Sequence, residues 1–115
     1  MNERGVEVLV AAALAGVPQI QGALKDNGEG RCAMGVLADA KPLGRGLVRY
    51  FGLAEKRMAC PECGATSFSY LYERGLIIHL NDRHGWDFLA IARKLGPAVE
   101  LHEAEEARRE GGDHA

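Results

Sequence analysis

The segment Cys60-Pro-Glu-Cys63 is followed after fifteen residues by His79 and, after four more, by His84. Two cysteines at this spacing form a tight knuckle that directs both sulfurs at one ion, and two histidines from a helix can complete a tetrahedral ligand set. Pro61 favours the turn between the cysteines, and Gly64 favours the left-handed residue that closes it. The spacing predicts one structural Zn²⁺ per chain, with four ligands: Cys60, Cys63, His79 and His84.

The residues between these ligands resemble a Cys2His2 zinc finger, with Phe68 after the second cysteine and Leu76 three residues before His79. The usual finger has about twelve residues between its two ligand pairs, so the fifteen here predict a longer loop or a short β-hairpin. Histidines five positions apart face one ion only if the helix tightens or ends there. Two alternatives stay open: a Cys-x-x-Cys redox pair beside unrelated histidines, and core residues without a metal. The redox alternative would require a strand–helix–strand pattern, and the sequence has none.

Apolar residues recur at helical spacing along most of the chain, which predicts a mainly α-helical single-domain bundle with a zinc knuckle. Glycine, proline and capping residues such as Asp87 indicate where helices end or begin. We expect helices at about 5–16, 31–40, 43–52, 73–83, 88–95 and 98–109, with a short extended segment at about 67–72. Residues 1–96 are then a zinc-stabilised helical domain, and residues 97–115 a surface helix with a disordered acidic tail.

Four residues within these helices have expected structural roles. Cys32 is either a fifth candidate ligand or, as we expect, a small buried hydrophobe. Gly35 costs helix stability relative to alanine, and we expect the compensation to be close approach by another helix. Asn81 and Asp82, near the end of the histidine-bearing helix, are expected to bond the local backbone or to cap the next turn.

The chain has 115 residues, of which 47% are hydrophobic and 26% charged, and this fits one globular domain with a modest core. No apolar run reaches the length of a membrane span, because the run at 6–17 is short, rich in alanine and followed by no cleavage site. Three cysteines, two of them in the knuckle, fit a reducing compartment. We therefore expect a cytoplasmic protein that does not associate with a membrane.

Two parts of the chain resemble a family of small proteins of unknown function from bacteria and their phages. They are Gly30-Arg-Cys-Ala-Met-Gly-Val-Leu-Ala-Asp-Ala40, after an Ala-rich helix, and Ile78-His-Leu-Asn-Asp-Arg-His-Gly-Trp86 with Ala90-Ile-Ala92. Family members carry Arg-Cys-Ala-x-Gly-Ala-Leu and Leu-Asn-Asp…Trp…Ile-Ala segments. The resemblance implies a compact helical domain and a phage or prophage origin, hence the host cytoplasm, and carries no activity. Because some members lack the cysteine pair, it also implies that zinc is a stabilising addition to the fold.

Charge is unevenly distributed along a chain whose net charge is −2. Residues 41–60 contain five cations against Glu55 alone, whereas residues 96–115 contain six acidic residues against Arg108 and Arg109. The basic part can meet phosphates, or it can be a solvated helix face or a partner for the acidic tail. The candidate nucleic-acid contacts are Arg45, Arg49, Lys56, Arg57, Arg93 and Lys94.

The pattern as a whole predicts a small zinc-stabilised binding module that acts through protein–protein interaction with host machinery. The alternative is a regulatory DNA-binding zinc protein, favoured by the finger-like spacing and by a helix pair at 73–95 that resembles a helix-turn-helix. A zinc enzyme is a weaker alternative, because both His-x-Glu with Pro-Cys-x-x-Cys and His-Glu-x-x-His are absent. Glu62 and Glu73, the nearby glutamates, are expected to be solvated. We predict no catalytic residue.

Overall fold

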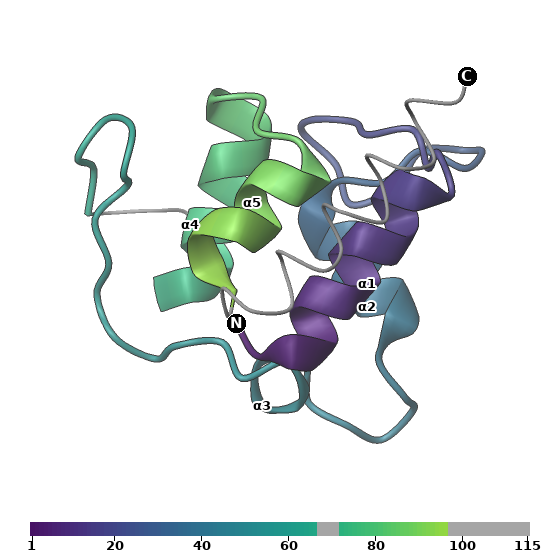
Figure 1. Cartoon of the computed structure of the whole chain (residues 1–115), viewed down its shortest axis with the longest axis horizontal. Coiled ribbons are helices and arrows are strands. Elements are labelled where there is room, and N and C mark those ends of the chain that lie inside the picture. Colours follow the sequence, from purple (N-terminus) through teal and green to yellow (C-terminus); the bar gives the residue numbers. More distant parts are fainter. Residues whose placement is uncertain (67–71, 97–115) are drawn as a thin grey trace.

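Five α-helices make up the regular structure of residues 1–66 and 72–96, the parts of the chain that the computed structural model describes (Figure 1). Their bounds are α1 Glu3–Leu14, α2 Ala33–Ala40, α3 Leu47–Tyr50, α4 Tyr72–Arg83 and α5 Phe88–Leu95. Within these ranges no strand forms, and the backbone pairs only in isolated bridges of Gln19 and Lys25 with Arg31. The predicted mainly helical fold is confirmed. Residues 67–71 of the expected extended segment or hairpin and the helix at 98–109 lie outside the described residues, and Tyr72, expected to be extended, begins α4.

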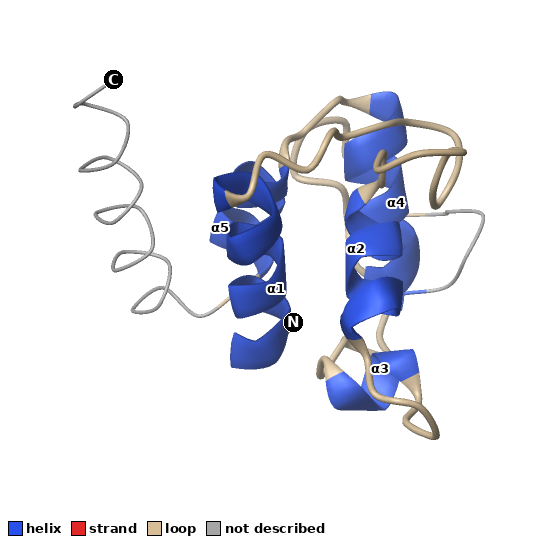
Figure 2. Cartoon of the chain, turned by 90° about the vertical axis from the view of Figure 1, so that its right-hand side faces the viewer, coloured by secondary structure: helices blue, strands red, loops and turns tan. Residues whose placement is uncertain are grey.

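The helices form two layers, α1 with α5 and α2 with α4, and α3 lies at one end (Figure 2). Each of the four long helices packs mainly against two others, because α1 packs against α5 and α2, and α4 packs against the same two. This arrangement encloses one core. Its largest fully buried apolar side chains are Leu9, Met34, Leu37, Phe51, Leu76, Ile77, Leu80 and Ile91. Burying each of them contributes about 1.5 to 3 kcal/mol.

Side chains cap the N-termini of three of these helices, α1, α2 and α5. The Asn2 side chain accepts from the Gly5 amide at 3.2 Å, and the Asp87 side chain accepts from the Ala90 amide at 2.7 Å. Cys32 takes the same position at α2, where its buried sulfur accepts from the Gly35 amide at 3.3 Å. Each bond satisfies an amide that the first turn leaves unpaired. Cys32 is thus a buried cap of α2.

The third helix is shorter than the sequence predicts. The expected start near residue 43 is wrong, because Gly44 has φ +80° and breaks the helical backbone, and α3 begins only at Leu47, after the N-cap Gly46. Leu43, which stands four residues before Leu47 and eight before Phe51 in the expected helix, is 99% exposed at this turn. Phe51 alone of the three is fully buried.

Gly35 is required by a close contact with a loop. A Cβ at this position would collide with the carbonyl oxygen of Leu24, which lies in the segment between α1 and α2. The same carbonyl accepts from the Cys32 amide at 3.1 Å, so the loop is held against the first turn of α2. The expectation that another helix approaches Gly35 is wrong, since its neighbour is loop backbone.

Two buried polar side chains fix the ends of α4, the helix that carries His79. Glu73 is 2% exposed and accepts from the Met1 amino group at 2.7 and 3.0 Å and from the Ala54 amide at 2.6 Å. Asn81 is fully buried and accepts from the Ala33 amide at 3.0 Å. The expectation that Glu73 is solvated is therefore wrong.

Asn81 also differs from its predicted local role. Its side-chain amide donates to the carbonyl of Ile20 at 2.8 Å, and its oxygen accepts from the Gln19 side chain at 2.8 Å as well as from Ala33. A further bond runs to the neighbouring Asp82 side chain at 2.8 Å. Asn81 thus joins α4 to the loop before α2 and to the first turn of α2.

Among the described residues, no helix is both long enough and apolar enough to cross a membrane.

Candidate metal centre

The cysteine knuckle is a tight turn in the segment between α3 and α4. The Gly64 amide donates to the carbonyl of Cys60 at 2.8 Å, and the Cys60 amide donates to the carbonyl of Ala65 at 2.8 Å. Gly64 has φ +77°, the left-handed conformation predicted for it. The Glu62 amide donates to the Cys60 sulfur at 3.4 Å, the kind of bond that stabilises a thiolate. The knuckle buries Cys60 and leaves Cys63 exposed.

The two histidines come together because α4 ends between them. Positions five apart on a continuous helix differ by about 140° in direction. Here α4 ends at Arg83, and Gly85 takes a left-handed φ of +64°. The Trp86 amide then donates back to the carbonyl of Leu80 at 3.0 Å, which closes the helix end. His84 therefore turns toward His79, and their rings meet edge to face with centroids 4.8 Å apart.

The ligand atoms of Cys60, Cys63, His79 and His84 all lie within 4.8 Å of one another. The Nε2 atoms of the two histidines are 3.1 Å apart, and the Cys63 sulfur is 3.3 Å from the His79 Nε2. A tetrahedral ion with the usual sulfur and nitrogen bond lengths requires separations of roughly 3.3 to 3.8 Å. The four side chains predicted as ligands thus form a group that could bind a metal ion.

The environment of His79 favours the form that binds a metal. Burial, the neighbouring His84 and the Arg83 cation lower the pKa of His79 below its ordinary value. A lower pKa leaves more of the imidazole neutral near pH 7, and only the neutral ring has a free lone pair for an ion.

Glu62 lies against the metal group, and its side chain is 47% exposed, so it faces water, as the sequence predicted, and the site as well. One of its carboxylate oxygens accepts from the Trp86 indole nitrogen at 2.5 Å and lies 3.4 Å from the His84 Nδ1. Glu62 and Trp86 were missed as site residues. Their positions next to the predicted ligands could have identified them, because Glu62 stands between the two cysteines and Trp86 stands two residues after His84.

Cys32 and Leu76 lie outside this group. Burial raises the pKa of the Cys32 thiol, which is the capping residue of α2. A protonated, buried thiol does not provide the thiolate that a metal requires. Leu76 is buried in the core, as its position in the finger-like pattern predicts, and Phe68 falls in the segment that is not described.

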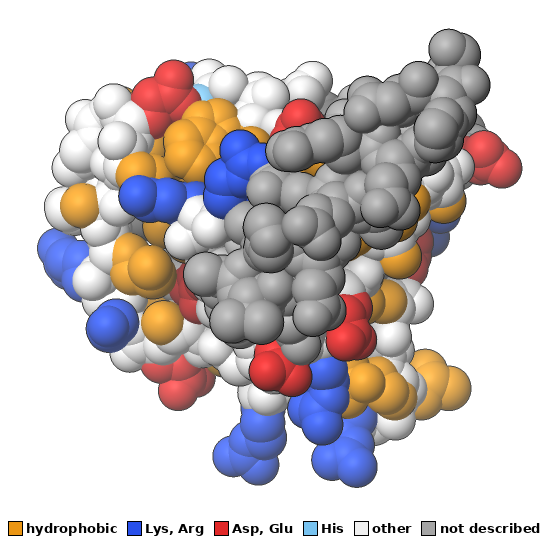
Figure 3. Space-filling model, viewed as in Figure 1, with side chains coloured by type: hydrophobic (Ala, Val, Ile, Leu, Met, Phe, Trp, Pro, Cys, Tyr) orange, Lys and Arg blue, Asp and Glu red, His pale blue; other side chains and the backbone are white. Residues whose placement is uncertain are grey.

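The predicted nucleic-acid contacts occupy three places in the fold. They are the turn and helix at α3 (Arg45, Arg49), the segment after it (Lys56, Arg57) and the last turn of α5 (Arg93, Lys94), and all six are exposed. On the face shown in Figure 3, Lys and Arg side chains occur in separate groups. Arg4 was not among the predicted nucleic-acid contacts. It lies over the ring of Tyr50, 4.8 Å from the ring centroid, and so adds a cation to the end of the fold where α3 lies.

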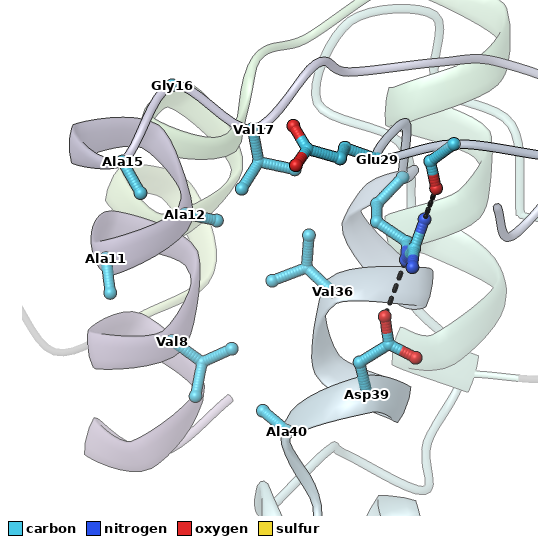
Figure 4. Close-up of a pocket in the computed structure, with 12 residues that line it drawn as sticks. Val8, Ala11, Ala12, Ala15, Gly16, Val17, Glu29, Val36, Asp39 and Ala40 are labelled. Atoms are coloured by element: carbon cyan, nitrogen blue, oxygen red, sulfur yellow. Dashed lines mark hydrogen bonds and ion pairs between the residues drawn. The ribbon is translucent and has the colours of Figure 1, made fainter. Parts of the chain in front are cut away.

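An open groove of about 650 Å³ runs between α1 and α2 (Figure 4). Small apolar side chains line it from both helices, among them Val8 and Ala12 on α1 and Val36 on α2. Its polar edge includes an ion pair between Arg31 and Asp39, at 2.5 Å.

Comparison with protein-family models, with curated proteins and with solved structures gave no match.

Proposed function

We propose that the protein is a small zinc-stabilised binding module. The observation that carries this proposal is the convergence of two cysteine sulfurs and two histidine Nε2 atoms from two separate segments. Sulfur and imidazole ligands in a tetrahedral arrangement favour Zn²⁺ over harder ions such as Mg²⁺ and Ca²⁺. Four protein ligands would leave no open position for water, and for that reason we assign the ion a structural role.

Zinc would hold the knuckle against the end of α4. Residues 51–66, which follow α3, contain no helix and contribute few buried apolar side chains, chiefly Phe51, Leu53 and Cys60. Burial alone therefore stabilises this segment weakly. Metal binding in small sites of this kind contributes on the order of 10 kcal/mol to folding, which is enough to order such a segment.

We propose a protein as the binding partner, because the described surface exposes large apolar side chains. Leu43 is 99% exposed at the turn before α3, and Leu14 and Leu24 are each about half exposed. The groove between α1 and α2 adds further apolar surface. The groove is the contiguous part of this apolar surface, and contiguous apolar surface is what marks protein interfaces. The resemblance to small bacterial and phage proteins suggests host machinery as the partner class.

A nucleic acid is the second candidate partner, favoured by the cations around α3. Arg45 and Arg49 are exposed there, and Arg4 stacks on Tyr50 at the same end of the molecule. Arginines in one place can contact phosphates. The net charge of −2 and the separation of the other cations favour the protein partner.

Native mass spectrometry of the purified protein tests the metal. We expect one Zn²⁺ per chain, lost on chelation and in Cys63→Ser. The matched control is Cys32→Ser, which removes a cysteine outside the ligand group and should keep one Zn²⁺. A wild-type protein that purifies without metal and does not take up added Zn²⁺ would contradict the proposal.

A further inference from the structure

We propose that Glu62 is a positioning residue of the metal centre, which holds the His84 ring so that its Nε2 lone pair faces the ion. This inference rests on the proposed zinc function. It assigns a role to a side chain that is not itself a ligand.

The His84 ring lies between two groups. Its Nε2 is 3.1 Å from the His79 Nε2, inside the ligand group, and its Nδ1 is 3.4 Å from the Glu62 Oε2. A neutral imidazole carries one proton, and its other nitrogen carries the lone pair. A carboxylate beside Nδ1 stabilises the proton at that atom, which leaves the lone pair on Nε2. Carboxylates commonly hold metal-binding histidines in this way.

Glu62 is itself held in place. Its backbone amide donates to the Cys60 sulfur, and its Oε2 accepts from the Trp86 indole nitrogen at 2.5 Å. Trp86 is fixed in turn, because its carbonyl accepts from the Gln19 side chain at 2.6 Å and its amide bonds the end of α4. The carboxylate thus bridges the knuckle, which supplies both cysteines, and the turn after α4, which supplies His84.

A solvated role is the alternative, since the Glu62 side chain is 47% exposed. Removing a charge that only faces water would not change the affinity for zinc much, because solvent screens it. Removing a carboxylate that orients His84 would, because the ring could then rotate or place its proton on Nε2. Zinc affinity therefore separates the two roles.

The test compares zinc dissociation constants, measured by competition with a chelator, for wild type, Glu62→Gln, Glu62→Ala and the control Glu55→Gln. Glu55 is an exposed glutamate before the knuckle. We expect Glu62→Ala to weaken binding by about 10- to 100-fold. Glu62→Gln should lose less zinc affinity, because its side-chain oxygen can still accept a hydrogen bond from the His84 Nδ1–H. Glu55→Gln should match the wild type.

Wild type that binds no zinc would overturn the proposed function, whereas wild-type affinity in Glu62→Ala would overturn only the role of Glu62. A second variant, Trp86→Phe, removes the indole donor and leaves the carboxylate beside His84. We expect it to keep most of the zinc affinity. If Trp86→Phe loses as much as Glu62→Ala, the carboxylate acts through the turn at Trp86, and the inference about His84 is overturned.

The ring of His84 provides a spectroscopic readout. In zinc-loaded wild type, ¹⁵N NMR should show a proton on Nδ1 that exchanges slowly with water, because Glu62 accepts a hydrogen bond from the Nδ1–H. In Glu62→Ala the same proton should exchange faster while the zinc remains bound at excess metal. Unchanged exchange in Glu62→Ala would also overturn the inference.

Discussion

The side-chain oxygen of Asn81 lies 3.0 Å from the backbone nitrogen of Ala33, and both residues are fully buried. This bond joins the helix that carries His79 to the first turn of α2. The position of one half of the metal group therefore depends on a polar contact in the core.

Replacing Asn81 with alanine should destabilise the protein by about 2 to 4 kcal/mol, because it leaves the buried Ala33 amide unpaired and removes two further hydrogen bonds. The two further bonds join Asn81 to the Ile20 carbonyl and to the Gln19 side chain. Urea unfolding measures the change. Asn27→Ala is the matched control, since Asn27 is exposed in a loop, and it should change stability by less than about 0.5 kcal/mol. Equal effects of the two substitutions would contradict the role of Asn81.

Removing a ligand and removing zinc should have the same effect on thermal stability. We expect chelation to lower the melting temperature of the wild type by many degrees, because metal binding in such sites is linked to folding. Cys63→Ser and His79→Ala should melt at similarly low temperatures, and chelation should not lower them further. Scanning calorimetry with and without chelator provides the measurement. A wild-type melt that chelation leaves unchanged would show that the site is empty or irrelevant to stability.

Gly35→Ala should destabilise the protein by about 2 kcal/mol, although alanine is the better helix former. The added Cβ meets the carbonyl oxygen of Leu24, which is backbone and cannot rotate away. Gly46→Ala is the control, because no atom lies within 4 Å of a Cβ there and its φ is −73°. Chemical denaturation of both variants should separate them. Similar stabilities would mean that the loop at Leu24 moves freely.

Glu73→Ala should cost about 3 to 5 kcal/mol, because it leaves a buried amino group without its carboxylate. In the structure the Met1 amino group and Glu73 form an ion pair at 2.7 Å, with side chains 0% and 2% exposed. The Ala54 amide loses its acceptor as well. Glu55→Ala, an exposed glutamate, should be nearly neutral by the same unfolding measurement. A neutral Glu73→Ala would show that the pair is not formed in solution.

The two candidate partners predict opposite responses to surface substitutions. If a protein is bound, Leu43→Asp should weaken its co-purification, and replacing Arg45 and Arg49 with glutamate should matter less. If DNA is bound, the double arginine variant should abolish binding and reduce the salt dependence of the wild type, while Leu43→Asp should have little effect. Binding assays at two salt concentrations distinguish the cases. Both sites are exposed, so neither change should unfold the chain.

Much of the fold was predictable because its signals are local. The repeat of apolar residues predicted all five helices, and Asp87 correctly marked the start of α5. The grouping of Cys60, Cys63, His79 and His84 was also predictable, because the spacing of the two cysteines and of the two histidines is typical of a zinc site. The start of α3 was not predictable, because the left-handed backbone at Gly44 interrupts the helix although the repeat of apolar residues continues through it.

The sequence by itself determined the helices and which four side chains meet, since both depend on spacing within short segments. The tertiary structure decided the partners of the buried and half-buried polar groups. Glu73 bonds a group 72 positions away, Asn81 bonds one 48 positions away, and Glu62 reaches Trp86 across 24. No local pattern specifies such pairs, because they form only when packing brings distant segments together and removes water from between them.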